Sequence, residues 1–253
     1  IAYLASSDFK VCEVDFAAAK PEAKELHAEH SSYVTGLALS GSTLVSGAYD
    51  GKLVWWDTEA GEVIRTTPDA HAKWIRKLAA SPDGTRIASV ADDMVCRIWN
   101  AETGKLVHEL RGHEEKTPHG YGSMLYALAY SPDGTLLAVA GFHEILLWKS
   151  DGSQLVARLI GLSERIQSIR FSPDGKRLAA AAGRPAQMGE IQIWNVDKRQ
   201  LALSVPVGYD TLYGVNWSPD GKLVSFGSPD NSVRAINAES GQEVLLQSSH
   251  SDW

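Results

Sequence analysis

The chain has 253 residues, a formal net charge of −7, eight histidines and two cysteines. Acidic and basic residues are interspersed without any Lys/Arg run, which argues against nucleic acid as the main partner, and no apolar run approaches the roughly 20 residues that a membrane-spanning helix needs. Two cysteines, Cys12 and Cys96, give neither a disulfide framework nor a metal-binding spacing, so we expect buried thiols.

The first 29 residues predict a partial structural repeat. IAYLASS, residues 1–7, has the length and apolar pattern of one strand. FKVCEVDFAAAKPEAKEL, residues 9–26, predicts two more strands. A fourth strand that would complete the unit is missing from this part of the sequence.

A tetrapeptide, SPDG, then occurs four times, at intervals of 50, 41 and 46 residues. Proline suits the second position of a turn, aspartate bonds locally to the backbone, and glycine takes positive φ without strain. Short apolar runs of strand length flank each copy, so SPDG predicts a tight connection between antiparallel strands. Ser40-Gly41-Ser42 takes the same place once. The copies begin at Ser81, Ser131, Ser172 and Ser218.

A second period follows each of these hairpins. Each repeat continues into a strand, a polar turn and another strand, as in LVWWDTEAGEVI and CRIWNAETGKLV. Each unit therefore holds four short strands, a to d, in roughly 40–45 residues, which is typical of a propeller blade. The residues at the equivalent place in strand c are Trp56, Trp99, Trp148, Trp194 and Ile236.

This pattern predicts an all-β protein with one domain, residues 1–253, in which stacked blades bury the faces that one blade cannot bury alone. Five complete blades and a partial one are visible. The predicted units are residues 1–29 (partial), 30–67, 71–110, 113–158, 163–204 and 210–247, and residues 248–253 would start a further repeat. Because the sequence starts at Ile1 and stops in mid-repeat, we expect a segment of a longer chain.

The motifs GHxxx(V/I), SPDG, LxSGxxDGxxxxWD and ETG resemble those of the WD-repeat β-propellers over nearly the whole chain. The resemblance implies a parent ring of seven blades, the commonest number in that family, with a six-bladed or an eight-bladed ring as open alternatives. In that family a His, a Ser, an Asp and a Trp of one blade form a buried hydrogen-bonded tetrad. By motif, the residues implied are His30, Ser46, Asp50 and Trp56 in one blade, and His71, Ser89, Asp93 and Trp99 in the next.

Three later blades depart from this pattern. His113 is present in one, but Val139 replaces its serine and the turn reads Gly141-Phe142-His143-Glu144. The blade around Trp194 has no matching His, Ser or Asp, and the last blade keeps only Asp230. The strand pattern is intact in all three, so we expect the fold to persist there.

Both complete tetrads contain a Ser-His-Asp set, which raises the possibility of an enzyme. Their repetition at identical strand positions predicts burial, whereas a nucleophile needs exposure and an oxyanion site. A zinc site among His113, His119 and His143 is conceivable on sequence alone, but solvated loop histidines are the default and no metal or other cofactor is expected.

Binding is the more informative prediction. The d–a and b–c loops of all blades lie on one face, and both irregular insertions, residues 111–123 and 183–189, fall in such loops. The residues just before each strand a should surround the channel mouth on the same face. The residues predicted to bind a partner are Tyr33, Trp74, His113, His119, Tyr121, Met124, His143, Arg165, Arg184 and Met188, with Thr211 and Trp253 at further equivalent positions.

The sequence therefore predicts a non-catalytic scaffold that binds a protein or peptide through this loop face. Aromatic and Met side chains would provide apolar anchors, and Arg165 and Arg184 would pair with acidic groups. Two alternatives stay open. One is a propeller enzyme of hydrolase or lactonase type with a site at the channel mouth, and the other is a sensor module of a larger multidomain protein.

Overall fold

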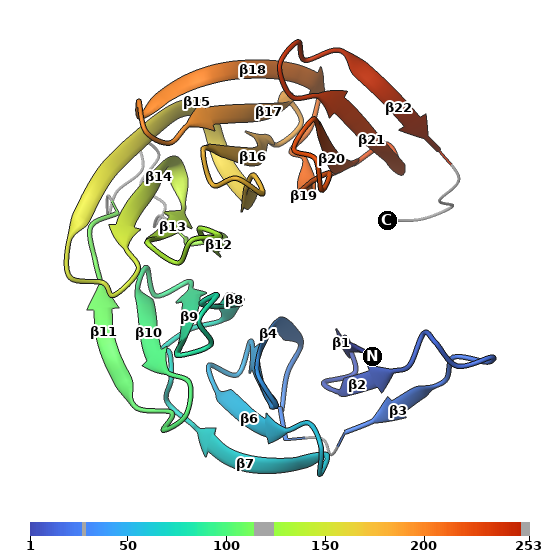
Figure 1. The fold of residues 1–253 in the computed structure, drawn as a ribbon, viewed down its shortest axis with the longest axis vertical. Coiled ribbons are helices and arrows are strands. Elements are labelled where there is room, and N and C mark those ends of the chain that lie inside the picture. Colours follow the sequence, from blue (N-terminus) through green and yellow to red (C-terminus); the bar gives the residue numbers. More distant parts are fainter. Residues whose placement is uncertain (27–28, 114–123, 249–253) are drawn as a thin grey trace. The chain divides into compact units, whose positions relative to one another are not determined.

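The computed structural model describes residues 1–26, 29–113 and 124–248, and all regular structure in these residues is β-strand. The chain forms two compact units, residues 1–112 and 113–253, which are described separately. Sheets of antiparallel neighbours, joined in chain order, make up both units (Figure 1). The predicted all-β class is confirmed for the described residues.

The first unit contains three sheets. The N-terminal sheet has only three strands, in the order β1-β2-β3, and the two that follow have four each. The strands of the first unit are β1 (Ala2–Ala5), β2 (Val11–Val14), β3 (Ala23–Glu25), β4 (Val34–Ser40), β5 (Thr43–Ala48), β6 (Leu53–Asp57), β7 (Glu62–Thr67), β8 (Ile75–Ala80), β9 (Arg86–Ala91), β10 (Cys96–Asn100) and β11 (Leu106–Leu110).

The second unit contains a seven-stranded and a four-stranded sheet. Its strands are β12 (Ala127–Tyr130), β13 (Leu136–Ala140), β14 (Phe142–Lys149), β15 (Leu155–Phe171), β16 (Arg177–Arg184), β17 (Met188–Asn195), β18 (Gln200–Gly208), β19 (Tyr213–Trp217), β20 (Leu223–Ser228), β21 (Ser232–Asn237) and β22 (Glu243–Gln247).

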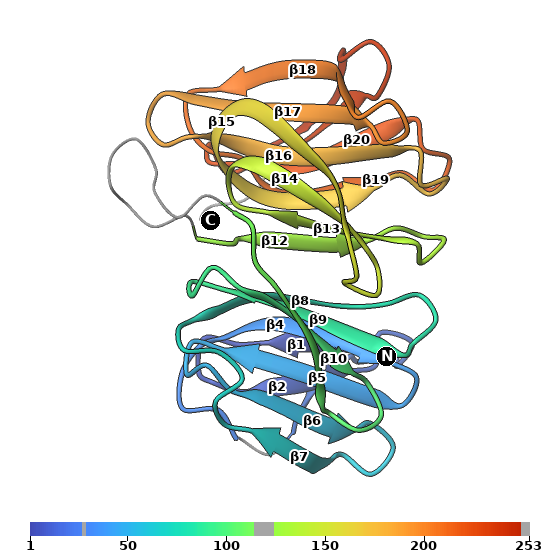
Figure 2. The same ribbon diagram turned by 90° about the vertical axis from the view of Figure 1, so that its left-hand side faces the viewer.

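The seven-stranded sheet arises because β15 serves two predicted blades. Figure 2 shows it as one long strand running past β14 and on beside β16. Residues 157–165, ARLIGLSER, contain no Pro, Asn or Asp that would enforce a turn between strands d and a. The boundary predicted between residues 158 and 163 therefore falls inside a continuous strand.

All four SPDG segments form the same turn between strands a and b. In each, the glycine has a φ of 68–71° and its N–H donates to the serine carbonyl over 2.9 Å. In the first copy, Ser81 Oγ donates to Asp83 Oδ1 and accepts from the N–H of Arg86. The bond to the serine hydroxyl lowers the pKa of Asp83 to about 2. The repetition of SPDG is thus architectural.

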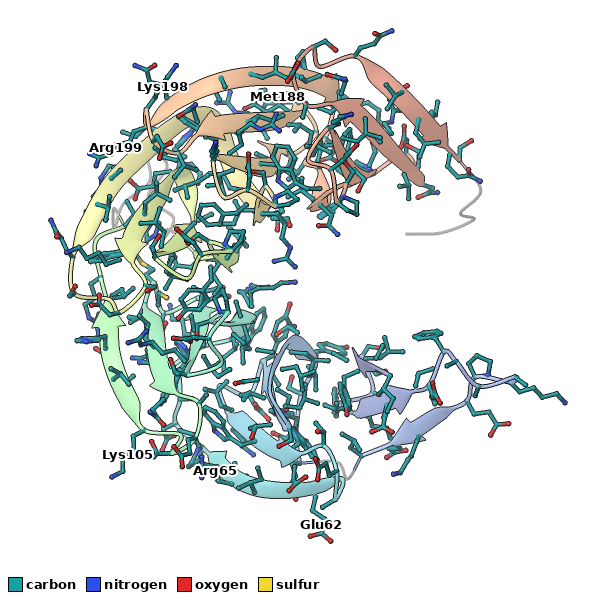
Figure 3. The ribbon with its side chains drawn as sticks, viewed as in Figure 1. Glu62, Arg65, Lys105, Met188, Lys198 and Arg199 are labelled. Atoms are coloured by element: carbon teal, nitrogen blue, oxygen red, sulfur yellow. The ribbon has the colours of Figure 1, made fainter. Side chains whose placement is uncertain are left out.

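Face-to-face packing of neighbouring sheets builds the core in each unit. In the first unit, Trp55 and Val45 of one sheet pack with Ile75 and Ile87 of the next. Arg65 of β7, labelled in Figure 3, extends to the β10–β11 turn of the next sheet. Its Nη1 donates to the Glu102 carbonyl over 2.8 Å. Stacking hides both faces of inner strands, which explains their nearly continuous apolar sequences.

Candidate functional site

The sheet β4–β7 and the loop before it hold a linear hydrogen-bonded chain of four polar side chains. Trp56 Nε1 donates to Ser46 Oγ over 2.9 Å, and Oγ lies 2.7 Å from Nε2 of His30. Because the Asp50 carboxylate can only accept, Nδ1 of His30 carries the hydrogen and donates to it over 3.2 Å. In this tautomer Nε2 accepts the hydrogen of the serine hydroxyl.

The Asp50 carboxylate is the last member of this chain, and it also holds the end of the d–a loop that leads into β4. It also accepts the backbone N–H groups of Ser31 and Lys52. Burial by itself raises the pKa of Asp50, but the bonds from His30 and the two backbone donors outweigh it and lower the pKa to about 2. The loop, the b–c turn and strand c are thereby joined in one network.

The sheet β8–β11 repeats the arrangement and adds a cation. Trp99 Nε1 donates to Ser89 Oγ over 2.9 Å, and Oγ lies 2.7 Å from Nε2 of His71. His71 Nδ1 lies 3.1 Å from Asp93, whose other oxygen accepts from Arg97 over 2.8 Å. Burial first, then the charge of Arg97, lowers the pKa of His71 despite the opposing carboxylate, so this imidazole is neutral at pH 7.

Neither Ser-His-Asp set can present a nucleophile. Ser46 and Ser89 are both 0% exposed, and each hydroxyl is engaged by an indole and an imidazole. A substrate carbonyl would need access to the serine oxygen together with donors for its developing charge. These two sets therefore join loops to sheets.

The blade that begins at His113 keeps part of the network with another acid. Glu144 lies near the start of β14, and its Oε1 lies 3.0 Å from Nδ1 of His113. Arg158 of β15 pairs with the same carboxylate. With Val139 in place of serine, Nε2 of His113 has no hydrogen-bond partner among the described residues. The sequence analysis named Glu144 as part of the segment 141–144 but did not predict that it replaces the tetrad aspartate.

The following blade replaces the whole chain with different residues. Trp194 Nε1 donates to Gln192 Oε1 over 3.2 Å, and Gln192 Nε2 donates to Glu190 over 2.6 Å. Glu190, which is 2% exposed, also accepts the hydroxyls of Ser163 and Ser204. Sequence reasoning found no match here because none of the three positions that hold His, Ser and Asp in the tetrads keeps its residue type.

Register explains how this replacement fits. Ala180 pairs with Gln192 across β16 and β17 at the position where Ser46 pairs with Val54. A small residue on strand b leaves room for a long amide on strand c. Gln192 therefore occupies the space of the serine hydroxyl from the opposite strand.

In the last four-stranded sheet the histidine, serine and tryptophan are all lost. Asp230 bonds to Ser232 and Arg234, and Arg234 also pairs with Glu243 over 3.0 Å. The equivalent of the serine is Phe226, which pairs with Arg234 as Ser89 pairs with Arg97. An arginine–aspartate pair thus remains where the tetrad is absent.

Four aromatic rings lie close together in the first unit: Tyr33 and Trp74 precede strands β4 and β8, and Phe9 and Tyr49 lie in the β1–β2 and β5–β6 turns. Tyr49 is half-buried, and the other three are exposed. We call Phe9, Tyr33, Tyr49 and Trp74 the aromatic row. Phe9 meets Tyr33 edge-on at 5.6 Å between ring centroids, and Tyr33 meets Tyr49 edge-on at 5.8 Å. Tyr49 then stacks on Trp74 at 4.5 Å and 8° between the ring planes. Tyr33 and Trp74, the two predicted members, are each 49% exposed.

Arg76 underlies one end of the aromatic row. Its guanidinium lies 5.1 Å from the Tyr49 centroid and 5.3 Å from that of Trp74, and Nη1 donates to the Tyr49 hydroxyl over 2.8 Å. Asp92 holds it through two bonds of 2.7 and 2.6 Å. Such a fork fixes the cation under both rings. Tyr49 and Asp92 were missed, although each directly precedes a tetrad aspartate.

The other predicted partner-binding residues belong to the second unit. Met124 and Arg165 are exposed, and Met124 Sδ lies 3.5 Å from the Tyr126 hydroxyl. His143 contacts the Phe142 ring edge-on and has a φ of 63°. Arg165 pairs with Gly183 across β15 and β16.

Three residues of the predicted surface are more constrained than expected. Arg184, opposite Met188 in the β16–β17 turn, already pairs with Glu164 over 3.0 Å. Thr211, at the place equivalent to Trp74, is 2% exposed and offers no contact surface. His113 is likewise buried. His119, Tyr121 and Trp253 lie outside the described residues.

No cluster of three or more His, Cys, Asp or Glu side chains in residues 1–26, 29–113 and 124–248 is arranged to hold a metal ion. Within the same residues no helix has the length and apolar character needed to cross a membrane.

Comparison with known proteins gives the family. A model described as "WD domain, G-beta repeat" matches residues 23–57, 61–100, 104–153 and 203–237. The gap between residues 153 and 203 contains strands a to c of the blade in which Glu190 and Gln192 replace the tetrad. That blade keeps its strand pairing without the family's sequence signature.

Curated relatives with WD repeats include three of diverse origin. The chain is 30% identical to Nuclear distribution protein PAC1-2 of Uncinocarpus reesii over 60% of this chain and 36% of that protein. It is 32% identical to Apoptotic protease-activating factor 1 of Rattus norvegicus, over 57% and 12%. It is 28% identical to the Guanine nucleotide-binding protein subunit beta of Arabidopsis thaliana, over 62% and 43%.

The chain therefore spans less than half of the length of each of these relatives. The family match extends over most of the chain and coincides with its antiparallel sheets. As the motifs predict, this chain belongs to the WD-repeat family, and its fold class is the all-β β-propeller.

Proposed function

We propose that the chain is a non-catalytic scaffold that binds protein or peptide partners through its d–a and b–c loops, with the aromatic row as the main contact. The relatives fit a role in protein interaction in general, and the plant relative is by its name a subunit of a larger protein. The repeat boundaries and the single domain predicted from the sequence are part of this proposal.

One observation carries the proposal: four adjacent aromatic rings, three of them exposed and one half-buried, lie in contact, and a partly buried ion pair holds two of them from below. Aromatic side chains and arginine dominate the energetics of many interfaces because they bury a large area at a small entropic cost. The Arg76–Asp92 fork and the Tyr49–Trp74 stack order the row before a partner arrives. A preorganised surface loses less conformational entropy on binding.

In the second unit, the accessible predicted residues are Met124, Arg165 and Met188. Met adapts to different apolar surfaces, and no ion pair joins Arg165 to a carboxylate among the described residues. We include them as a second contact that favours acidic groups. Arg184 contributes less than its sequence position suggests because Glu164 neutralises it.

Affinity capture with variants of the chain tests this surface. Trp74→Ala should remove captured proteins that bind the wild type, with a loss of at least about 30-fold in affinity for a residue at the centre of an interface. Phe16→Ala is the control, because Phe16 is 64% exposed but lies outside the row. Arg165→Ala probes the second contact. Circular dichroism and thermal melts establish that the variants fold.

Loss of the same proteins from Phe16→Ala would mean that aromatic exposure alone drives capture. Retention of every captured protein by both Trp74→Ala and Arg165→Ala would refute the proposed face.

A further inference from the structure

The sheet β19–β22 contains a hollow where the tetrad sheets hold a histidine. His30 and His71 each precede the serine of the a–b turn, Ser40 and Ser81, by ten residues. Ten residues before Ser218 the chain has Gly208. A Cβ added there would meet nothing within 4 Å, and the φ of Gly208 lies outside the left-handed region.

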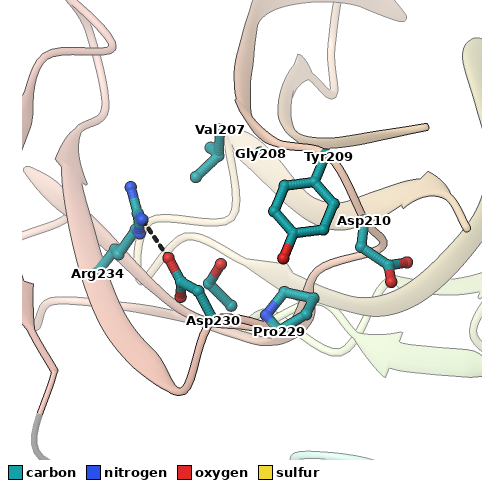
Figure 4. A pocket seen from close by; sticks show the side chains of 8 residues that line it. Val207, Gly208, Tyr209, Asp210, Pro229, Asp230 and Arg234 are labelled. Carbon is teal, nitrogen blue, oxygen red and sulfur yellow. Dashed lines mark hydrogen bonds and ion pairs between the residues drawn. The ribbon is translucent and has the colours of Figure 1, made fainter. Parts of the chain in front are cut away.

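The hollow lies between the d–a loop and the b–c turn of this sheet. Its volume is about 140 Å³, well above the ~10–15 Å³ that one ordered water needs by the same measure. Figure 4 shows the Tyr209 ring on one side and the Arg234–Asp230 pair on the other. The lining residues are Val207, Gly208, Tyr209, Asp210, Ser228, Pro229, Asp230 and Arg234.

Asp230 lacks the donors that its equivalents receive from the d–a loop. Asp50 accepts from His30 and the Ser31 N–H, and Asp93 from His71 and the Ala72 N–H. In the last sheet, no residue of the described d–a loop donates to Asp230, whose bonds come from its own turn and from Arg234.

The charge at the hollow is negative. Arg234 is the one cation of the lining, against Asp210 and Asp230, and Glu243 draws on the same guanidinium. No ion pair joins Asp210 to a cation among the described residues, and its Oδ1 accepts only the N–H of Thr211. Tyr209, which is 73% exposed, adds an aromatic face at the rim. Carboxylates beside an aromatic face favour a cation that can donate N–H bonds.

We propose that this hollow is a binding site for one basic side chain of a partner polypeptide, inserted where the tetrad sheets hold their own histidine. The incoming N–H group donates to Asp230, and its charge is balanced by Asp210. The site is separate from the aromatic row, which belongs to the other unit, so either can fail without the other.

Titration of the ¹⁵N-labelled chain with N-acetyl-arginine methylamide tests the site by NMR. We expect saturable shifts of the Gly208, Tyr209 and Asn231 amides with a Kd of about 1 mM, as befits a single side chain. The citrulline analogue, which is neutral and of similar shape, should give no saturable shift. The lysine and histidine analogues show which N–H geometry the hollow prefers.

Two substitutions that fill the hollow should abolish binding: Gly208→His supplies the missing ring, and Gly208→Leu fills the space without a donor. Asp210→Asn should weaken binding about fivefold. Glu239→Gln is the charge-matched control, because Glu239 is exposed in the β21–β22 turn, and its Kd should stay within about twofold of the wild type.

Equal shifts from the citrulline analogue would overturn the proposal, as would unchanged binding in Gly208→Leu. An Asp210→Asn effect no larger than that of Glu239→Gln would overturn the assigned charge role. Partner capture by Trp74→Ala has no bearing on these outcomes, so failure of the proposed scaffold function remains distinguishable.

Discussion

The sheets β8–β11 and β19–β22 have the same four-strand order and the same arginine–aspartate pair, Arg97 with Asp93 and Arg234 with Asp230. In one sheet a buried imidazole fills the space beside the aspartate, and in the other a glycine leaves that space open. The comparison teaches that strand pairing and apolar stacking suffice for the sheet. The polar tetrad is a separable addition that fixes the loops.

The sheet around Trp194 gives a third solution to the same problem. A buried indole N–H needs an acceptor, and Gln192 supplies it where Ser46 and Ser89 do elsewhere. The last sheet avoids the need altogether, since Ile236 replaces the tryptophan. What is kept in each case is the satisfaction of buried polar groups rather than one set of residues.

The largest expected effect comes from removing the histidine of the sheet β8–β11, which makes that sheet resemble β19–β22. His71→Ala leaves Asp93 and Ser89 buried without their partner, and it should lower the free energy of unfolding by about 3 kcal/mol. Urea unfolding followed by tryptophan fluorescence measures the change. Gly208→Ala is the matched control and should change stability by less than about 0.5 kcal/mol, because no partner is lost there.

A loss below about 1 kcal/mol in His71→Ala would contradict the view that the tetrad ties loops to sheet.

The second test concerns the replaced network. Gln192→Leu deprives the Trp194 indole and Glu190 of a partner, and it should cost about 2 kcal/mol of stability. Adding Ala180→Ser in the same chain should restore about 1 kcal/mol, because residue 180 has the register of Ser46. Denaturant midpoints and the NMR signal of the Trp194 indole N–H report both changes.

If the double variant is no more stable than Gln192→Leu alone, the equivalence of the two strand positions is wrong.

The third test sharpens the comparison in the opposite direction. Gly208→His should raise stability by about 1 kcal/mol, or a few degrees in Tm, by giving Asp230 its missing donor. The gain is smaller than the loss in His71→Ala because Phe226 offers no hydroxyl to the other ring nitrogen. Gly208→Leu serves as control, since an equal gain there would show that filling space, and not hydrogen bonding, is responsible.

The smallest expected effect is a dependence on pH. The pKa of His71 is lowered from its ordinary 6.5, chiefly by burial. Below pH 6.5 the unfolded chain therefore binds a proton that the folded chain does not, and stability falls as the pH is lowered. We expect stability to fall between pH 7 and pH 5.5, and this fall should disappear in His71→Ala.

A second acid window belongs to Asp50, Asp83 and Asp230, whose pKa values all fall from 3.8 to about 2. Their contribution is present above pH 4 and is lost as the pH falls towards 2. Equilibrium unfolding of wild type and His71→Ala across both windows separates the histidine from these carboxylates. A slope near pH 6 that persists in His71→Ala would assign the effect to another residue.

The sequence alone determined the fold class, since SPDG turns and apolar runs of strand length specify local hairpins whatever surrounds them. The resemblance of its motifs to the WD-repeat family also indicated His30, Ser46, Asp50 and Trp56 as one set. It could not show that Gln192 of β17 takes the place of a serine on the neighbouring strand β16, since that depends on cross-strand register.

What only the tertiary structure decided is which side chains meet. Turn and strand preferences act over a few neighbouring residues, so they are written locally in the sequence. The ring contacts from Phe9 to Trp74 join three sheets of one unit, and the hollow at Gly208 is bounded by a loop and a turn about 20 residues apart. Both depend on packing between segments distant in the chain, and no local pattern encodes that distance.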